Sequence, residues 1–225
     1  RKDSRIQLHL GQANRGVSHA TNQALALCTS PFTVLLDHDD LLEPQALYRV
    51  AESVQQDDPD LLYSDEVLVT PDGASVLQQV LRPVFSPEYL REHPYIVHLV
   101  GFRTALLREL GGLDETLAIS QDYDLILRAS ERAQTIVHIP EVLYQWRTHP
   151  ASAGHARADE VMRASCGVLQ RHLDRVGHLD DMVVGQHVAI AADDDARAEA
   201  GRALPALAEA LAEHEGAEQG GEQHR

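Results

Sequence analysis

The chain has 225 residues, of which 44% are hydrophobic and 24% are charged, and its formal net charge is −16 at pH 7. That length is sufficient for one α/β domain with a sizeable core plus an appendage, and the acidity argues against sequence-independent nucleic-acid binding, which requires a basic surface. The two cysteines are far apart and no apolar run approaches the ~20 residues that cross a bilayer, so we expect a cytoplasmic protein without a disulfide framework or a transmembrane segment.

Apolar periodicity predicts alternating strands and helices along the chain, which indicates an α/β fold. Strands are expected at residues 6–10, 32–37, 60–63, 95–100, 135–139 and 142–146. Helices are expected at residues 18–28, 44–56, 87–92, 104–110, 122–131 and 158–175. We therefore expect one domain over residues 1–155 and a helical extension over residues 156–192.

Residues 193–225 differ in composition from the rest of the chain. They hold nine acidic residues against three arginines and are rich in Ala, Glu and Gly. Such a segment buries too little apolar surface to fold alone, so we expect an acidic tail that is largely disordered, with one short helix at residues 204–211. A helix that binds a partner is the alternative interpretation.

An acidic cluster, Asp37-His38-Asp39-Asp40, follows the apolar run 32–36. In open α/β sheets, ligands bind at the carboxyl ends of the strands. Carboxylates this close together repel one another unless a cation lies between them, and hard oxygen ligands suit Mg²⁺ or Mn²⁺. His38 should point away from its neighbours, because side chains alternate at a strand end. The alternative is an acidic loop in which Asp40 or Glu43 caps the next helix.

A series of motifs resembles family 2 glycosyltransferases of the GT-A fold, in the family's order, over roughly residues 5–155. They are Asn14-x-Gly16-x-Ser18, then Leu36-Asp37-His38-Asp39-Asp40, Tyr63-Ser64-Asp65-Glu66, Gly111-Gly112-Leu113-Asp114, Ser120-Gln121-Asp122-Tyr123-Asp124, His138-Ile139-Pro140 and Trp146-Arg147-x-His149. The resemblance implies a doubly wound, mostly parallel sheet. The family's first strand–helix–strand unit, which holds the nucleotide base, has no counterpart here, so we expect a fragment of a larger enzyme.

The resemblance also implies roles on the side of the sugar donor, a nucleoside diphosphate sugar. Asp37 would face the ribose, and Asn14 and Gly16 would contribute to the same nucleotide site. Asp39, together with Asp40, would hold Mn²⁺ or Mg²⁺ on the diphosphate. The cation would act there as a Lewis acid on the phosphate oxygens.

Further residues are implied on the acceptor side. Asp122 would be the general base that deprotonates the acceptor hydroxyl, and the alternative for it is a helix cap. His149 would be a third metal ligand. Asp65 and Glu66 would lie near the acceptor or serve loop structure, and Trp146 would be a core anchor or a platform for the acceptor sugar.

The resulting hypothesis is a metal-dependent, inverting hexosyltransferase. It would move a hexose or deoxyhexose to a saccharide or lipid-linked saccharide acceptor in cell-surface polysaccharide synthesis. We expect the protein in the cytoplasm, and peripheral association with the inner face of the membrane is compatible with polysaccharide synthesis. The alternatives are a non-catalytic fragment that binds sugar or a partner, and a metal-dependent phosphohydrolase that uses Asp37 and Asp39.

Overall fold

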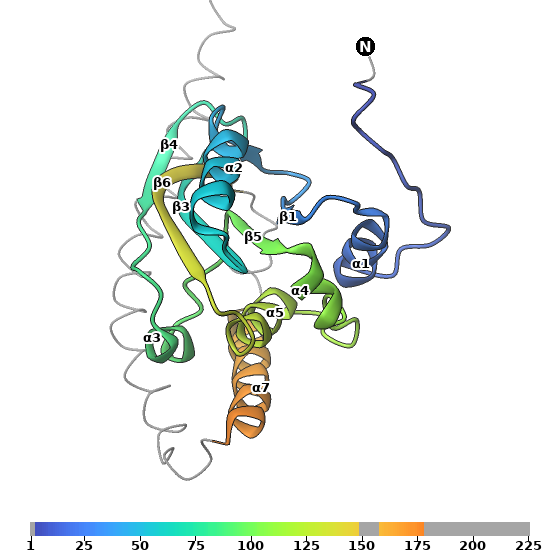
Figure 1. Ribbon diagram of the computed structural model, residues 1–225, viewed down its shortest axis with the longest axis vertical. Helices are drawn as coiled ribbons and strands as arrows, with labels where there is room; N and C mark the ends of the chain where they lie inside the picture. The colour runs from blue at the N-terminus through green and yellow to red at the C-terminus, as the bar shows by residue number, and fades with distance from the viewer. Residues whose placement is uncertain (1–2, 149–157, 178–225) are drawn as a thin grey trace, which may run out of the picture. The chain divides into compact units, whose positions relative to one another are not determined.

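The computed structural model describes residues 3–148 and 158–177, which form the elements labelled in Figure 1. The helices are α1 (Val17–Leu27), α2 (Ala46–Asp57), α3 (Pro87–Glu92), α4 (Thr104–Glu109), α5 (Gln121–Ser130) and α7 (Ala158–Val176). The strands are β1 (Phe32–Leu35), β2 (Leu41–Leu42), β3 (Leu61–Val69), β4 (Val76–Val80), β5 (Val100–Arg103) and β6 (Ile136–Arg147). None of these helices is long and apolar enough to cross a membrane.

The sheet is mixed, which corrects the expectation of a mostly parallel sheet. Its strands lie in the order β1-β5-β3-β6-β2, and β4 pairs with the other part of β3. Among the described residues, only β3 and β6 pair in parallel, whereas β1–β5, β3–β5, β3–β4 and β2–β6 are antiparallel. One physical reason lies in the short turn after β3, closed by the Thr70 N–H donating to the Ser75 carbonyl at 2.9 Å, because a tight turn can join only antiparallel strands.

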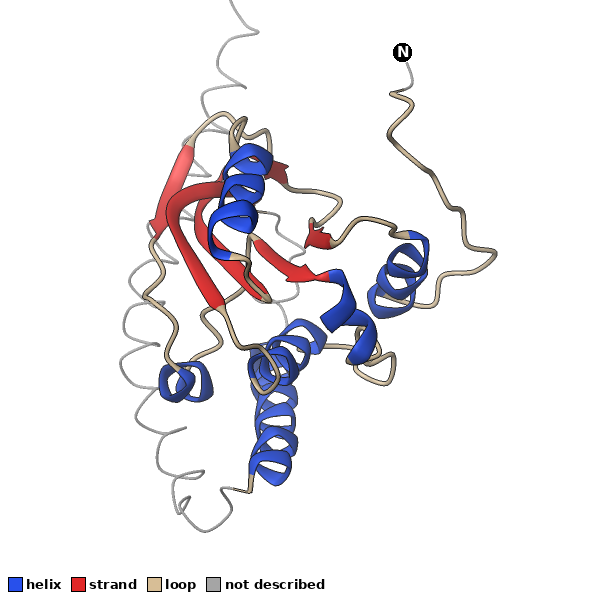
Figure 2. Cartoon of the chain, in the orientation of Figure 1, coloured by secondary structure: helices blue, strands red, loops and turns tan. Residues whose placement is uncertain are grey.

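Two apolar clusters cover opposite faces of β3, since successive side chains of a strand alternate between faces. Leu61 and Tyr63 belong to a cluster that includes residues of α4, α5 and α7, whereas Leu62 belongs to one that includes residues of α2. In Figure 2, α2 lies over the strands, whereas α5 and α7 lie below their lower ends. β3 is buried along nearly its whole length, so it is the central strand of the fold.

Several predicted elements differ from the structure. Residues 6–10 form no strand and pair with no described strand, and Ile6, Leu8 and Leu10 are about three-quarters exposed at 76–77%. The segment before β5 is a loop up to Val100, and the short strands β2 and β4 were not expected. The two strands expected at 135–139 and 142–146 form the single strand β6, whose Pro140 lies in a bulge because Ser64 pairs with Ile139 and Asp65 with Val142.

The connection between β1 and β2 positions the acidic cluster. These two strands lie at opposite ends of the strand order, so residues 36–40 cross the ends of the strands between them. The crossing is tight, because the Asp40 N–H donates to the Asp37 carbonyl at 3.3 Å. It then joins β2, where Leu42 pairs with Tyr144. The acidic cluster is thereby brought against residues that are distant in the sequence.

Alanine at Gly111 and at Gly112 should have unequal effects. Both glycines have positive φ, +78° and +73°, so either substitution strains the backbone, at a cost of about 1–2 kcal/mol. A Cβ at Gly111 meets nothing within 4 Å, whereas one at Gly112 lies 2.3 Å from Asn22 Oδ1. That amide accepts from the Leu113 N–H and donates to the Leu113 carbonyl, both at 2.9 Å.

Displacing Asn22 breaks these bonds, so we expect Gly112→Ala to lower the free energy of unfolding by about 1–3 kcal/mol more than Gly111→Ala does. Urea unfolding of both variants measures the difference. Equal losses in the two variants would contradict the structural explanation.

Candidate functional site

Three side chains converge beside the crossing segment. Ligand atoms of Asp37, Asp40 and His98 all lie within 4.8 Å of one another. Asp37 is exposed, Asp40 is buried and His98 is half-buried. The two aspartates come from residues 36–40 and the histidine from the loop that precedes β5. Two carboxylates and one imidazole at this separation offer the oxygen and nitrogen ligands that divalent cations such as Mn²⁺ bind.

Asp40 is held by β6. Its Oδ1 accepts from the Arg147 backbone N–H at 2.8 Å, and its Oδ2 accepts from the Tyr144 hydroxyl at 2.7 Å. The Tyr144 oxygen also accepts from the Asp37 N–H at 3.2 Å. Burial raises the pKa of Asp40, and these two hydrogen bonds to its carboxylate oppose the rise. The carboxylate is therefore fixed in direction before any ligand binds.

His98 lies between two carboxylates. Its Nδ1 is 2.9 Å from Glu66 Oε2 and its Nε2 is 3.6 Å from Asp37 Oδ2, while its ring stacks on Tyr144 at a centroid distance of 4.6 Å. Burial alone lowers the pKa of His98, but the bonds to Asp37 and Glu66 outweigh it and raise that pKa to about 9. His98 in turn holds the pKa of Asp37 below its ordinary value. A cation bound by His98 must therefore displace a proton.

Asp65 and Glu66 lie inside the sheet, 4% and 1% exposed. Glu66 forms a salt bridge with Arg82 on one oxygen and contacts His98 with the other. Asp65 accepts from the Arg82 backbone N–H at 2.8 Å and pairs with His138 Nε2 at the same distance. Both carboxylates support the strand that carries them, and contact with an acceptor stays a prediction.

The remaining residues predicted on the donor side are exposed. Asp39 lies outside the three-residue group, with its carboxylate 3.6 Å from His38 and its backbone carbonyl accepting from Arg147. Asn14 accepts from the Gly16 N–H at 3.0 Å, in the turn that opens α1. The structure brings neither Asn14 nor Gly16 into a hydrogen bond with the acidic cluster.

The residues predicted on the acceptor side lie in three places. Asp122 is exposed at the start of α5, where its Oδ1 accepts from the Tyr123 N–H at 2.8 Å. Trp146 is half-buried and tilts against His98, with ring centroids 5.5 Å apart. His149 lies outside the described residues. The structure therefore joins Trp146, but not Asp122, directly to the group around His98.

Sequence reasoning assigned no role to His98 or Tyr144. The sequence offered one indication of a role for His98, which is that it interrupts the otherwise apolar residues 95–100. Tyr144 and Trp146 are two residues apart on β6, so they lie on the same face of the strand, and both rings contact His98. These contacts join segments more than 30 residues apart, so no local pattern marks them.

Residues 1–109 match the family model described as Glycosyl transferase family 2. The chain is 35% identical over 179 residues to the uncharacterized protein y4gI of Sinorhizobium fredii, an alignment that covers 77% of this chain and 20% of that protein. It is 34% identical over 179 residues to the O-antigen biosynthesis protein RfbC of Myxococcus xanthus, covering 78% of this chain and 14% of that protein. The chain thus spans about a fifth or less of the length of these two relatives.

Two solved structures share the fold. The mannosyltransferase PcManGT of Pyrobaculum calidifontis, in complex with GDP-Man and Mn²⁺, gives a TM-score of 0.54 at 20% identity and covers 89% of this chain and 60% of that one. TarS of S. aureus in complex with UDP-GlcNAc gives a TM-score of 0.54 at 20% identity and covers 71% of this chain and 48% of that one. The α/β fold with its mixed sheet therefore matches GT-A transferase structures.

His98 makes the stability of the metal-free chain depend on pH. The pKa of His98 in the folded chain, about 9, exceeds the ~6.5 of an unfolded histidine. Its stabilising contribution is therefore fully present below about pH 6.5 and is lost as the pH rises through 9. With EDTA present, urea unfolding should show a falling free energy of unfolding across this window. His98→Gln should remove the fall, and the exposed control His38→Gln should retain it. An unchanged fall in His98→Gln would exclude this assignment.

Proposed function

The chain belongs to glycosyltransferase family 2, and we propose that it transfers a sugar from a nucleoside diphosphate sugar to a saccharide or lipid-linked saccharide acceptor in cell-surface polysaccharide synthesis. The observation that carries the proposal is the group formed by Asp37, Asp40 and His98. It is supported by the names of similar proteins, among them an O-antigen biosynthesis protein and a mannosyltransferase in complex with GDP-Man and Mn²⁺.

The residues present fit a divalent cation. Asp37 and Asp40 offer carboxylate oxygens, which suit Mn²⁺ or Mg²⁺, and His98 offers a ring nitrogen within the same 4.8 Å. Asp39, which is exposed and adjacent to Asp40 in the chain, would be a further carboxylate ligand. When bound, the cation would supply positive charge to the diphosphate leaving group.

The rest of the donor site would be built by the chain's own side chains. The Tyr144 hydroxyl donates to Asp40 and accepts from the backbone N–H of Asp37, which would keep the Asp40 carboxylate oriented as a nucleotide enters. In the metal-free chain His98 Nε2 lies 3.6 Å from Asp37 Oδ2; with a cation on that nitrogen, the exposed Asp37 carboxylate would keep one oxygen for the cation and one to accept from a ribose hydroxyl. Orienting these groups before binding lowers the entropy cost of holding the donor in line with the acceptor.

Asp122 is proposed as the general base. Its Oδ1 accepts from the Tyr123 N–H, which orients a carboxylate that is otherwise exposed at the start of α5. It would take the proton from the acceptor hydroxyl as that oxygen attacks the sugar carbon and the diphosphate leaves. A single displacement of this kind inverts the configuration at the sugar carbon.

The donor site can be tested by binding, with Mn²⁺ alone as the first probe. We expect Asp37→Asn to weaken Mn²⁺ affinity by roughly tenfold or more, because one charged ligand is lost. Electron paramagnetic resonance of free Mn²⁺ measures the affinity, and His38→Gln is the matched control in the same loop. Melting temperatures with Mn²⁺ and UDP-, GDP- or dTDP-sugars then show which nucleotide stabilises the chain. Mn²⁺ binding that survives in Asp37→Asn would refute the assigned site.

Asp122→Asn should lower the rate of sugar transfer by roughly 10²–10⁴ while the affinity for the donor stays unchanged. Transfer of a radiolabelled sugar, from whichever nucleotide sugar stabilises the chain, measures the rate. Glu109→Gln is a suitable control, because Glu109 is an exposed carboxylate near the end of α4. Full transfer by Asp122→Asn would show that another group is the base.

A further inference from the structure

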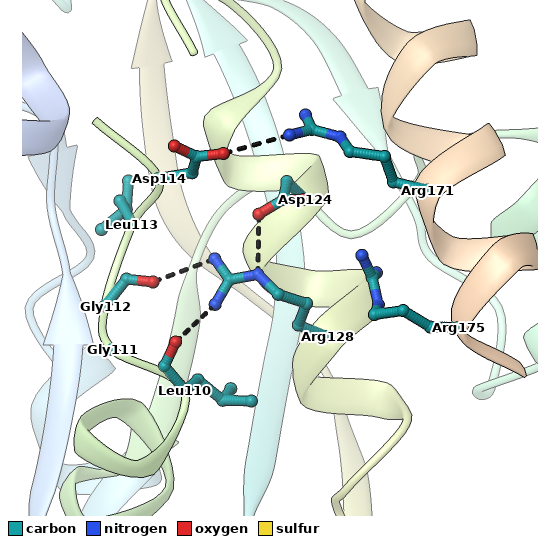
Figure 3. A pocket seen from close by; sticks show the side chains of 9 residues that line it. All are labelled: Leu110, Gly111, Gly112, Leu113, Asp114, Asp124, Arg128, Arg171 and Arg175. Atoms are coloured by element: carbon teal, nitrogen blue, oxygen red, sulfur yellow. Dashed lines mark hydrogen bonds and ion pairs between the residues drawn. The ribbon is translucent and has the colours of Figure 1, made fainter. Parts of the chain in front are cut away.

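A hollow built from residues that are distant in sequence from the acidic cluster is lined by three arginines. It has a volume of about 260 Å³ and is built from the loop after α4, from α5 and from α7 (Figure 3). The residues that line it are Leu110, Gly111, Gly112, Leu113, Asp114, Asp124, Arg128, Arg171 and Arg175. In a chain with a net charge of −16, three guanidinium groups around one hollow are a local exception.

Arg128 lines this hollow, and its side chain is held in place by hydrogen bonds within the chain. It donates to Asp124 at 2.7 Å and to the carbonyls of Leu110 and Gly112 at 2.9 Å each. These contacts, drawn in Figure 3, engage all three of its nitrogens. The side chain therefore holds the loop against α5, and its charge is balanced by Asp124.

The two arginines of α7 retain unused donors. Arg171 donates from Nη1 to Asp114 at 3.1 Å, and Arg175 binds Glu131 through Nε and Nη2. Among the described residues, Nε and Nη2 of Arg171 and Nη1 of Arg175 have no hydrogen-bond partner. The side chains are 40% and 34% exposed, so solvent reaches them. Spaced by four residues, they are neighbours on one face of the helix.

We propose that this hollow binds the phosphate group of a small phosphate monoester. A phosphate monoester carries nearly two negative charges and three acceptor oxygens, so it can engage the free donors of both Arg171 and Arg175. A carboxylate carries one charge and is satisfied by one guanidinium fork. Each of the three arginines pairs with one carboxylate, Asp124, Asp114 or Glu131, so the hollow offers free N–H donors rather than an excess of positive charge. The volume exceeds by far the ~15 Å³ that one water requires, which leaves room for the group attached to the phosphate.

Binding of inorganic phosphate and of glucose 1-phosphate to the full chain tests the proposal. Isothermal titration at constant ionic strength, with EDTA present, keeps the acidic cluster free of the cation that it would need to bind phosphate. We expect Arg171→Gln and Arg175→Gln each to weaken both ligands by about tenfold or more, since each removes a charge-assisted hydrogen bond. Arg163→Gln, exposed on the same helix, should leave binding unchanged. Acetate should bind at least tenfold more weakly than phosphate.

A second variant leaves every ion pair of the hollow in place. Gly111 has open space where a side chain would begin and a φ of +78°, a conformation that Asp tolerates better than most residues. Gly111→Asp should therefore weaken phosphate binding by charge repulsion even if loss of Arg171 or Arg175 unfolds α7. No phosphate binding by the parent chain, equal loss in Arg163→Gln, unchanged binding in Gly111→Asp, or acetate bound as tightly as phosphate would each overturn the proposal.

Discussion

The buried carboxylate of Glu66 holds together the segments from which the candidate site is made. Its two oxygens contact Arg82, in the segment after β4, and His98, in the loop before β5. His98 then reaches Asp37 in the crossing between β1 and β2. Removing one partner of a buried ion pair leaves an uncompensated charge and typically costs about 3–5 kcal/mol. The position of Asp37 thus depends on a charge balance inside the sheet.

The same balance gives the two aspartates of the site different properties. His98 keeps the pKa of Asp37 below its ordinary value, which favours the charged form of this carboxylate. Burial raises the pKa of Asp40, although Tyr144 and Arg147 donate to its oxygens. Pairs of groups whose surroundings drive their pKa values apart are typical of functional sites. An incoming cation would relieve the cost of burying Asp40 and take the place of the His98 proton.

The sequence predicted those parts of the site that depend on neighbouring residues. The acidic cluster lies at a strand end, as expected, because the apolar run before it and the polar residues after it are local signals. The partners of that cluster were not predictable, since His98 and Tyr144 reach it only through the pairing of strands distant in the sequence. The expectation of a mostly parallel sheet, which came from the family resemblance, was wrong. Two of the antiparallel pairs are made by β2 and β4, which carry too short or too polar a pattern to be recognised.

Register along β6 decides which side chains face the site. From Ser64 to Glu66, β3 advances by two residues while β6 advances by five, from Ile139 to Tyr144. An odd number of extra residues reverses the alternation of side chains beyond the bulge, because the period of a strand is two. The reversal brings Tyr144, in place of a neighbour in the chain, beside Asp40 and His98. The two extra residues at Pro140 leave the alternation unchanged, so the single extra residue Leu143, between Val142 and Tyr144, determines whether the Tyr144 hydroxyl faces Asp40 and donates to it.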